Sequence, residues 1–525
     1  MRRCVAALAL FLIGCPTVVV DDDDVVDDDD VGDDDSGDDD VGDDDVGDDD
    51  VGDDDSGDDD SAGTDPCWSG TDPVALFDMA AIRDGSTLDY QVVSTETVVK
   101  SLQWPPFVRT VQVSEVRYTS WQWEDCVQTP ISIEAWVAVP ADAIGSVGAR
   151  PGIVKAHGLG GNADQSAAAN PAAALDAVVI AYSGPGQGGS EGWGSSPDHL
   201  FDTVQDPRDS WMYEHPLAAL RGLTVLEAQV PEVDPARLGM TGYSGGGVAT
   251  YLANGVDSRI AAAVPSSATG YLDLAIAATP IPGWEHDLLQ SMNPPRDATS
   301  PEWARYVAWL DPQNFLATAS GPTLIINGAQ DEFFPINSTQ ATFAGLAAAA
   351  PATRLLTIID FDHGPLAVNN SFAAEWANHA GRYWFEHWLG GVQAYSAQAP
   401  MPEIVQVIPW LCPINNVPIL PCAHLTVSVG SGYPVDAVTF RWSTTNGAGE
   451  GGLLWQSWNL QDEGSGIWAA EVGTLDANVW TAANTAWYAE VEYSTGLASL
   501  DPGFRLSTGA SIPPGFSPVI LEIIE

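Results

Sequence analysis

Between residues 152 and 359, short apolar segments alternate with segments of helical spacing, and this alternation constrains the fold more than any other feature of the chain. Strands that are separated by helices usually pair in parallel, because the helix carries the chain back across the sheet. Segments typical of buried strands are Gly152–Ala156, Ala177–Ala181, Arg237–Thr241, Ile260–Val264, Thr323–Ile326 and Leu355–Ile359, and helical spacing covers Pro216–Val230 and resumes near Gly246. The sequence therefore predicts an α/β fold with a mostly parallel sheet, within a domain over residues 66–398.

Two regions of this domain depart from the alternation. Residues 66–150 are β-rich, since Val108–Trp123 and Ile131–Val139 alternate apolar and polar side chains. Residues 267–320 form a long, Trp-containing insertion between two predicted strands. Long insertions of this kind are usually functional, so we expect a helical cap that controls which substrates enter.

From about Ala399 the chain changes to Pro-rich linkers and short alternating strands. The predicted strands are Leu425–Val429, Ala437–Trp442, Leu453–Trp458, Ile467–Val472 and Ala486–Tyr493. Their spacing predicts a β-sandwich domain over residues 399–525.

The N-terminus is predicted to direct export. Arg2 and Arg3 precede an apolar run that is too short to span a bilayer and ends in Leu12-Ile13-Gly14-Cys15. This resembles a bacterial lipobox, so residues 1–15 are predicted to be a lipoprotein signal peptide with Cys15 as the lipidated residue. The alternative is an ordinary signal peptide with an incidental cysteine. We expect a lipid-anchored protein of the bacterial cell envelope, at the surface or in the periplasm.

Residues 16–65 are predicted to be a disordered tether. Asp occupies 26 of the positions 21–60, largely as a repeated Val/Ser-Gly-Asp-Asp-Asp unit. Such a segment has little to bury and repels itself. Specific calcium binding is the alternative, although the spacing of a folded calcium loop is missing.

Charge excludes some partners. The formal net charge is −55, and the only two lysines are Lys100 and Lys155. Without a basic patch, nucleic-acid binding is not expected.

Four cysteines remain after the signal peptide, and an even number in an exported protein favours disulfides. Cys412 and Cys422 flank a Pro-rich loop that they could close. Cys67 and Cys126 are then paired by elimination. Zinc is the alternative, but no CxxC spacing supports it. No metal and no cofactor is predicted.

A candidate nucleophile lies in Gly242-Tyr243-Ser244-Gly245-Gly246, directly between a predicted strand and a predicted helix. A sharp strand-to-helix turn projects the serine hydroxyl clear of the backbone, and the flanking glycines avoid clashes. Ser244 is therefore the predicted nucleophile.

The acid and the base should follow later strands. Asp331 comes after Thr323–Ile326 and is predicted to orient an imidazole, with Glu332 as the neighbouring alternative. His363 comes after Leu355–Ile359 and before a glycine, which makes it the predicted base.

Two other histidines, His379 and His387, lie in a helical pattern and are expected to be packing or surface residues. An oxyanion hole needs two backbone donors. The predicted donors are the N–H groups of Gly245 and of Leu159, which lies in a Gly-rich loop after the Gly152–Ala156 strand.

Residues 131–390 resemble the acetyl-xylan-esterase and prolyl-oligopeptidase branches of the α/β-hydrolases. The resemblance rests on ARPGIVKAHGLGGN (149–162), AYSGPGQGGSEG (181–192) and PEVDPARLGMTGYSGGG (231–247). It implies the α/β-hydrolase fold, in which the order Ser–Asp–His is usual.

A second resemblance is to PhoPQ-activated pathogenicity-related proteins, over LDPQNFLATASGPTLIINGAQDEFFP (310–335) and the Trp-rich Leu453–Pro513. That family, which is thought to be hydrolytic, typically places Lys-Arg after the nucleophilic serine. Gly245 and Gly246 stand there instead, so the esterase and peptidase branches are the better guide to this turn.

Three functions are weighed on this basis. The first is a serine hydrolase that cleaves carboxylic esters, such as acetyl or carbohydrate-linked esters, through an acyl-enzyme. The second is a serine peptidase of the prolyl-oligopeptidase type. The third is a non-catalytic, sugar-binding surface lipoprotein whose C-terminal tryptophans stack on sugars, although tryptophans on alternating strands usually pack in a core.

Overall fold

The computed structural model describes residues 67–102, 107–277, 283–329, 331–358, 363, 371–390, 404–411, 423–429, 434–444, 456–472, 485–493 and 504–507. All of them belong to one compact unit, Pro66–Glu525. The predicted signal peptide, Cys15, the tether, Cys412 and Cys422 lie outside the described residues.

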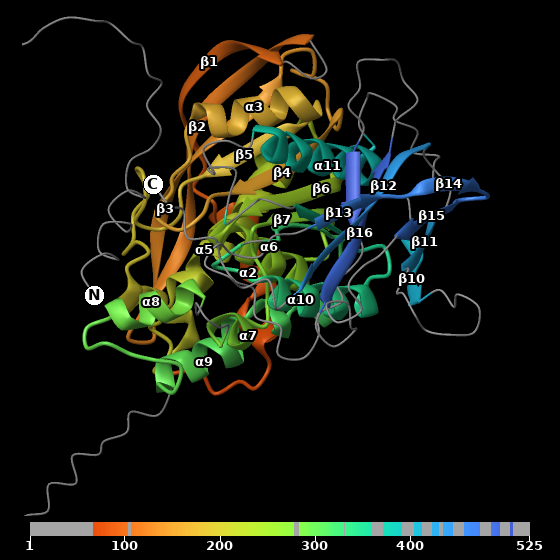
Figure 1. Cartoon of the computed structure of the whole chain (residues 1–525). Coiled ribbons are helices and arrows are strands. Elements are labelled where there is room, and N and C mark those ends of the chain that lie inside the picture. The colour runs from red at the N-terminus through yellow and green to blue at the C-terminus, as the bar shows by residue number, and fades with distance from the viewer. Residues whose placement is uncertain are drawn as a thin grey trace, which may run out of the picture. The chain divides into compact units, whose positions relative to one another are not determined.

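A thirteen-stranded sheet runs through this unit in the order β1-β2-β3-β5-β4-β6-β7-β8-β9-β17-β16-β12-β13 (Figure 1). The strands from its first edge to β9 are β1 (Gln91–Leu102), β2 (Phe107–Glu124), β3 (Val127–Pro140), β5 (Val178–Tyr182), β4 (Arg150–Ala156), β6 (Val233–Tyr243), β7 (Ile260–Ser266), β8 (Leu324–Gly328) and β9 (Arg354–Ile358). Pairing is antiparallel from β1 to β5 and parallel from β5 to β9. This is the α/β-hydrolase fold, and the predicted parallel sheet is confirmed in its central part, from β5 to β9.

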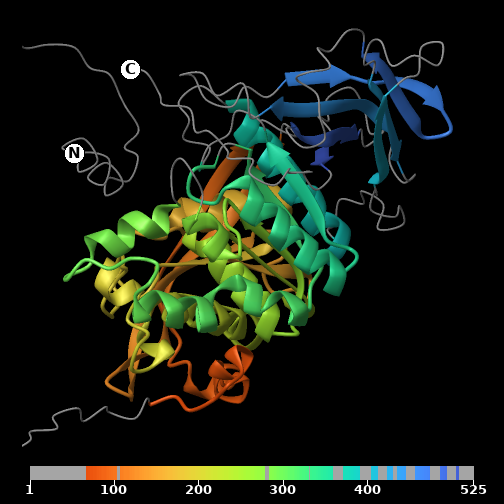
Figure 2. The same ribbon diagram turned by 60° about the horizontal axis from the view of Figure 1, so that its bottom comes forward.

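Helices cover both faces of the sheet because its central strands are apolar on both sides (Figure 2). Alternate residues of β4 and β5 enter two different cores. Val154 and Ile180 pack in the core that includes α5 (Trp211–Gln229) and α6 (Gly245–Val256). Ile153 and Val179 pack in the core that includes α3 (Gln165–Leu175) and α11 (Ser371–Leu389).

The insertion between β7 and β8 is helical, as predicted. It contains α7 (Leu272–Ile276), α8 (Trp284–Ser291), α9 (Pro301–Leu310) and the short 3₁₀ helices η5 (Pro312–Asn314) and η6 (Leu316–Thr318). In α9, Pro301 occupies the first turn and the Ser300 hydroxyl accepts the N–H of Trp303 at 3.3 Å, an arrangement typical of a helix start. Its buried face carries Trp303, Tyr306 and Trp309.

The C-terminal strands are antiparallel and form two groups. The strands β17 (Phe504–Ser507), β16 (Thr485–Tyr493), β12 (Val435–Thr444) and β13 (Gln456–Asn459) continue the central sheet, since Ser507 on β17 pairs with Leu355 on β9. A separate four-stranded sheet contains β10 (Ile404–Leu411), β11 (Ala423–Val429), β15 (Ile467–Val472) and β14 (Gln461–Gly464).

Three of the C-terminal tryptophans pack in or against the second core. Trp442 is buried, with its ring centroid 5.1 Å from that of Trp458, and Trp468 contacts the same cluster. Their side chains therefore contribute to packing.

The β2–β3 hairpin is closed by a tight turn and a disulfide. Glu124 pairs with Val127, and the two residues between them, Asp125 and Cys126, both have positive φ, as a type I′ turn requires. Cys126 forms a disulfide with Cys67, so this predicted pair is present.

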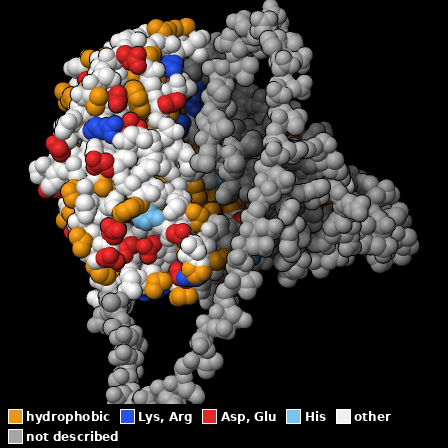
Figure 3. Space-filling view, turned by 90° about the vertical axis from the view of Figure 1, so that its left-hand side faces the viewer, with side chains coloured by type: hydrophobic (Ala, Val, Ile, Leu, Met, Phe, Trp, Pro, Cys, Tyr) orange, Lys and Arg blue, Asp and Glu red, His pale blue; other side chains and the backbone are white. Residues whose placement is uncertain are grey.

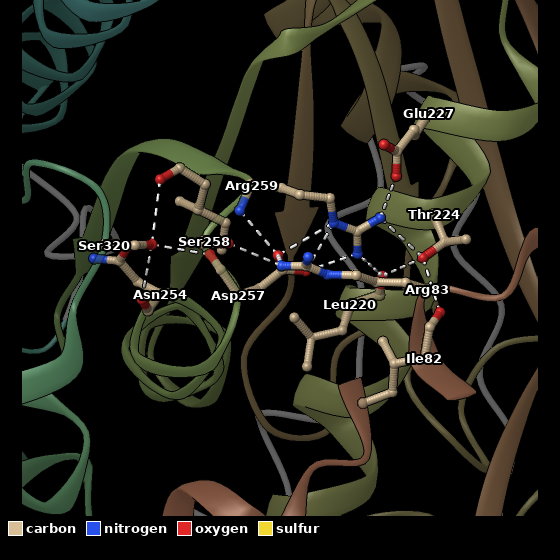
Figure 4. A network of polar contacts seen from close by, with 11 residues as sticks. Ile82, Arg83, Leu220, Thr224, Glu227, Asn254, Asp257, Ser258, Arg259 and Ser320 are labelled. Carbon is tan, nitrogen blue, oxygen red and sulfur yellow. Dashed lines mark hydrogen bonds and ion pairs between the residues drawn. The ribbon is translucent and has the colours of Figure 1, made fainter. Parts of the chain in front are cut away.

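A buried ion network joins α5, the end of α6 and the short helix α2 (Met79–Ile82) (Figure 4). The side chain of Asp257 is fully buried and forms ion pairs with Arg83 and Arg259. Arg259 also binds Glu227 of α5 at 2.6 Å. The network ties the N-terminal segment to the helices that support the central strands.

Acidic side chains gather beside a histidine on the face seen in Figure 3. Among the described helices, none combines the length and the apolar character that crossing a bilayer requires.

Candidate active site

Ser244 stands at the junction of β6 and α6 with an unusual backbone conformation. Its φ is 56° and its ψ is −122°, a region that costs a non-glycine residue about 1–3 kcal/mol. The N–H of Ser244 donates to Ser266 O at 3.0 Å, which fixes the turn against β7. The strain therefore belongs to a turn that the neighbouring strand holds in place.

The glycines of this turn are required by close backbone approaches. A Cβ at Gly242 would overlap the backbone of Gly246, and a Cβ at Gly246 would overlap the carbonyl groups of Ala156 and His157. The turn from β6 to α6 can therefore pack against the end of β4 only with glycine at positions 242 and 246.

His363 lies between Ser244 and Asp331. Its Nε2 is 2.9 Å from Ser244 Oγ, and its Nδ1 is 3.1 Å from Asp331 Oδ1. Asp331 and His363 are both buried, at 3% and 7% exposure. The three predicted triad residues come from three different strand ends, and His363 is within hydrogen-bonding distance of both Ser244 and Asp331.

Asp331 and Glu332 contact different parts of His363. Asp331 Oδ1 accepts the N–H groups of Phe333 and Phe334 at 3.0 and 2.9 Å, which holds the carboxylate toward the ring. Glu332 instead accepts the backbone N–H of His363 at 3.2 Å. Of the two alternatives, the geometry therefore selects Asp331 as the partner of the imidazole.

Aromatic rings shield the imidazole. The ring centroids of Phe333, Phe334 and Tyr243 lie 4.4, 5.6 and 5.4 Å from that of His363. Tyr243 also donates its hydroxyl to His363 O at 2.6 Å. No feature of the sequence separated these residues from ordinary packing residues.

The backbone of Leu159 lies beside Gly245. A Cβ built on Gly245 would be 3.2 Å from Leu159 N, so the two predicted oxyanion donors come from adjacent segments. Among the described residues, neither N–H donates a hydrogen bond to a protein acceptor. Both are thus free to bind an oxyanion.

His157 holds the loop that carries Leu159. Its Nε2 accepts the N–H of Gly184 at 2.7 Å, so its Nδ1 carries the proton and donates to Gly158 O at 2.7 Å. Burial lowers the pKa of His157 to about 4, which keeps the ring neutral at pH 7. The His157 carbonyl in turn lies 3.2 Å from His215 Nε2. Sequence reasoning missed this role, and the His-Gly pair that opens the loop was the available signal.

The remaining predicted positions are also located. His379 and His387 lie on helix α11, as the helical pattern predicted, and His379 is buried. Within the described part of the chain, no group of three or more His, Cys, Asp or Glu side chains could hold a metal ion.

Comparison with known families and structures gives the following matches. The family model described as PhoPQ-activated pathogenicity-related protein matches residues 201–375, which include Ser244, Asp331, His363 and the 310–335 stretch but not the Trp-rich tail. No curated protein matches the chain.

Solved structures are similar over part of this chain. An acetyl xylan esterase from Paenibacillus sp. R4 is 21% identical, with a TM-score of 0.45 over 59% of this chain and 94% of its own. Acetyl xylan esterase 1 from Thermoanaerobacterium sp. JW/SL YS485 is 18% identical, with a TM-score of 0.39 over 60% and 94%. The acylaminoacyl peptidase of Pyrococcus horikoshii is 14% identical, with a TM-score of 0.40 over 55% of this chain and 49% of its own.

Proposed function

We propose that this chain, which has the α/β-hydrolase fold, is a serine hydrolase that cleaves carboxylic esters through an acyl-enzyme. The observation that carries the proposal is the continuous chain of contacts from Ser244 Oγ through His363 to Asp331. Nucleophile, base and orienting acid in this arrangement are the parts that acyl transfer requires.

The proposed reaction has two halves. Ser244 Oγ attacks the acyl carbon while its proton passes to His363 Nε2, and Asp331 stabilises the imidazolium. The oxyanion binds the N–H groups of Gly245 and Leu159, and His363 returns the proton to the leaving alkoxide oxygen. Water, deprotonated by His363, then attacks the acyl-enzyme and releases the carboxylic acid and Ser244.

Esters are the proposed substrates because an alkoxide leaves more readily than an amide nitrogen. A peptidase would use the same triad and is the second arm of the test. Trp284 of the cap helix α8 lies against Phe334, which contacts His363, so we propose that the cap borders the acyl or alcohol site.

The test is mapping of a fluorophosphonate label together with turnover of p-nitrophenyl esters and aminoacyl-nitroanilides. We expect the adduct on Ser244. Ser244→Ala and His363→Ala should each lower ester turnover by on the order of 10³-fold or more, because the two act as a unit. An adduct on another serine, or full activity in Ser244→Ala, would contradict the mechanism. Faster anilide than ester cleavage would contradict the ester assignment alone.

We further propose that the enzyme is exported and lipid-anchored at Cys15. The Cys67–Cys126 disulfide is consistent with an oxidising compartment.

A further inference from the structure

Strand β1 forms one edge of the central sheet, and only one of its sides is paired among the described strands (Figure 1). It pairs with β2 along its length, from Gln91 opposite Arg117 to Leu102 opposite Phe107. The backbone N–H and C=O groups on the outer side of so long a strand are a template for another strand.

The exposed side chains of this edge are those that sheets normally cover. Val92 and Val93 are each 55% exposed, and Val99 is 64% exposed. Val108, which pairs with Ser101 from the adjacent strand β2, is 67% exposed. β-branched side chains favour a half-buried pleated surface, so a further strand beside β1 would cover Val99, which solvent now contacts.

Two opposite charges on β1 form no ion pair with any described residue. Glu96 and Lys100 lie on the same face four residues apart, about 13 Å along a strand, which is too far for an ion pair between them. Each instead contacts a polar residue of α3: Gln165 donates to Glu96, and Lys100 Nζ is 3.4 Å from Ser166 Oγ.

We propose that β1 pairs antiparallel with β1 of a second copy of this chain, with the two-fold axis at Val98. Residues directly opposite each other in an antiparallel pair share one face of the sheet. In this register Glu96 of each copy lies opposite Lys100 of the other, so the dimer contains two Glu96–Lys100 ion pairs. Thr97 lies opposite Val99, and the two Val99 side chains become diagonal neighbours.

The symmetry supports a second copy rather than an unrelated partner. A closed two-fold dimer needs one surface that is complementary to itself. The positions of Glu96 and Lys100, equally spaced on either side of Val98, meet that requirement. Lys100 is also one of only two lysines in a chain of net charge −55.

Lys100 could instead protect the edge, because a lysine on an edge strand is a common way to block strand pairing. The two explanations predict opposite results. If Lys100 blocks pairing, its replacement increases self-association. If it forms an intersubunit ion pair, its replacement by an acid decreases self-association.

A cysteine at the axis tests the register in the full-length chain. Val98→Cys places two thiols opposite each other, within the Cβ separation at which a disulfide forms after slight adjustment. We expect a covalent dimer on a non-reducing gel. Thr95→Cys is the matched control: Thr95 lies opposite Ser101, so its two copies are about 20 Å apart and should not crosslink. Equal crosslinking of both variants, or of neither, would overturn the register.

Reversing the charge of Glu96 or Lys100 tests the ion pairs. Dimerisation is measured by sedimentation velocity at about 0.15 M salt, where the Debye length is about 8 Å. Glu96→Lys and Lys100→Glu should each weaken dimerisation on the order of tenfold, because each creates two like-charge contacts. The double exchange should restore it. Glu124→Lys, on an exposed site away from the edge, is the control. Far-UV circular dichroism checks folding of each variant. A wild-type protein that stays monomeric, or a Lys100→Glu variant that associates more strongly, would refute the proposal.

Discussion

Glu285 is a carboxyl group in an environment that disfavours its charge. The side chain is fully buried in α8, and neither carboxyl oxygen has a hydrogen-bond partner among the described residues. Burial raises the pKa of Glu285 well above its ordinary value of 4.5, and the carboxylates of Asp311 and Asp331 raise it further. Glu285 therefore binds its proton more tightly in the folded protein than in the unfolded chain.

This burial predicts how stability depends on pH. Because the folded-state pKa of Glu285 is the raised one, the folded protein binds the extra proton. Its contribution to stability is complete below about pH 4.5 and declines as pH rises toward the folded-state pKa. Over that range, Glu285→Gln should gain stability relative to wild type by about 1.4 kcal/mol per pH unit.

Urea unfolding between pH 4 and pH 8 measures this difference. Asp287→Asn is the matched control, since Asp287 is an exposed carboxyl on the same helix. A constant difference between Glu285→Gln and wild type across this range would show that Glu285 is ionised in the folded state.

The two neighbouring acids of the site should differ in their effect on catalysis. Asp331→Asn should lower ester turnover by about 10³–10⁴-fold, because an amide cannot stabilise the imidazolium and favours the wrong tautomer. Glu332→Gln should cost far less, since Glu332 accepts the backbone N–H of His363, whereas Asp331 faces the imidazole Nδ1. Steady-state kinetics of both variants decide between them, and equal losses would argue against Asp331 as the orienting acid.

At the scale of elements, the buried ion network of Figure 4 joins three helices. Burial acts to raise the pKa of Asp257, but the hydrogen bonds and charge of Arg259 outweigh it and the pKa is lowered overall. The paired carboxylate therefore contributes stability above its unfolded pKa of about 3.8, and this is lost as pH falls through the folded-state pKa.

Asp257→Asn should consequently destabilise the fold by about 3–5 kcal/mol at pH 7, because it removes the fully buried partner of the buried Arg259 charge. The loss should shrink at acidic pH. Glu227→Gln, which removes a partly exposed partner of the same arginine, should cost no more than about 1 kcal/mol. Thermal unfolding of both variants is the measurement, and similar losses would indicate that burial of the pair does not matter.

Helix α5 illustrates how element boundaries escape sequence reasoning. The predicted segment began at Pro216, whereas the helix begins at Trp211 after the N-cap Ser210. Proline is typical of a first helical turn, which favours a start at Pro216. The helix instead contains the proline, because every side chain from Trp211 to Leu226 is buried by its neighbours.

At the scale of the whole molecule, anchoring remains a prediction about residues outside the described part of the chain. If Cys15 is lipidated, Cys15→Ser should move the protein from the membrane fraction to the soluble fraction while leaving ester hydrolysis unchanged. Mass spectrometry of the wild-type N-terminus should detect acyl chains. A membrane-bound Cys15→Ser variant together with an unmodified wild-type terminus would remove the basis for the anchor.

Strands from the C-terminal region, which the sequence assigned to a separate domain, extend the central sheet. Ser507 on β17 pairs with Leu355 on β9, and its hydroxyl accepts the N–H of Thr357 at 2.8 Å. These partners are about 150 residues apart. Alternation along β12 and β16 predicts strands, whereas β17 was not predicted, and no local pattern says which sheet a strand joins.

The sequence by itself determined the parallel strands, the turn at Ser244, and the order in which Asp331 and His363 follow it. These features depend on periodicity and on glycines within a few residues, which are local properties. Only the tertiary structure decided that His157 holds the Leu159 loop, that Asp331 rather than Glu332 faces the imidazole, and that Glu285 is buried with no hydrogen-bond partner for its carboxyl oxygens among the described residues. Each of these depends on contacts between segments that are distant in the chain or on small differences in side-chain direction, which no local pattern encodes.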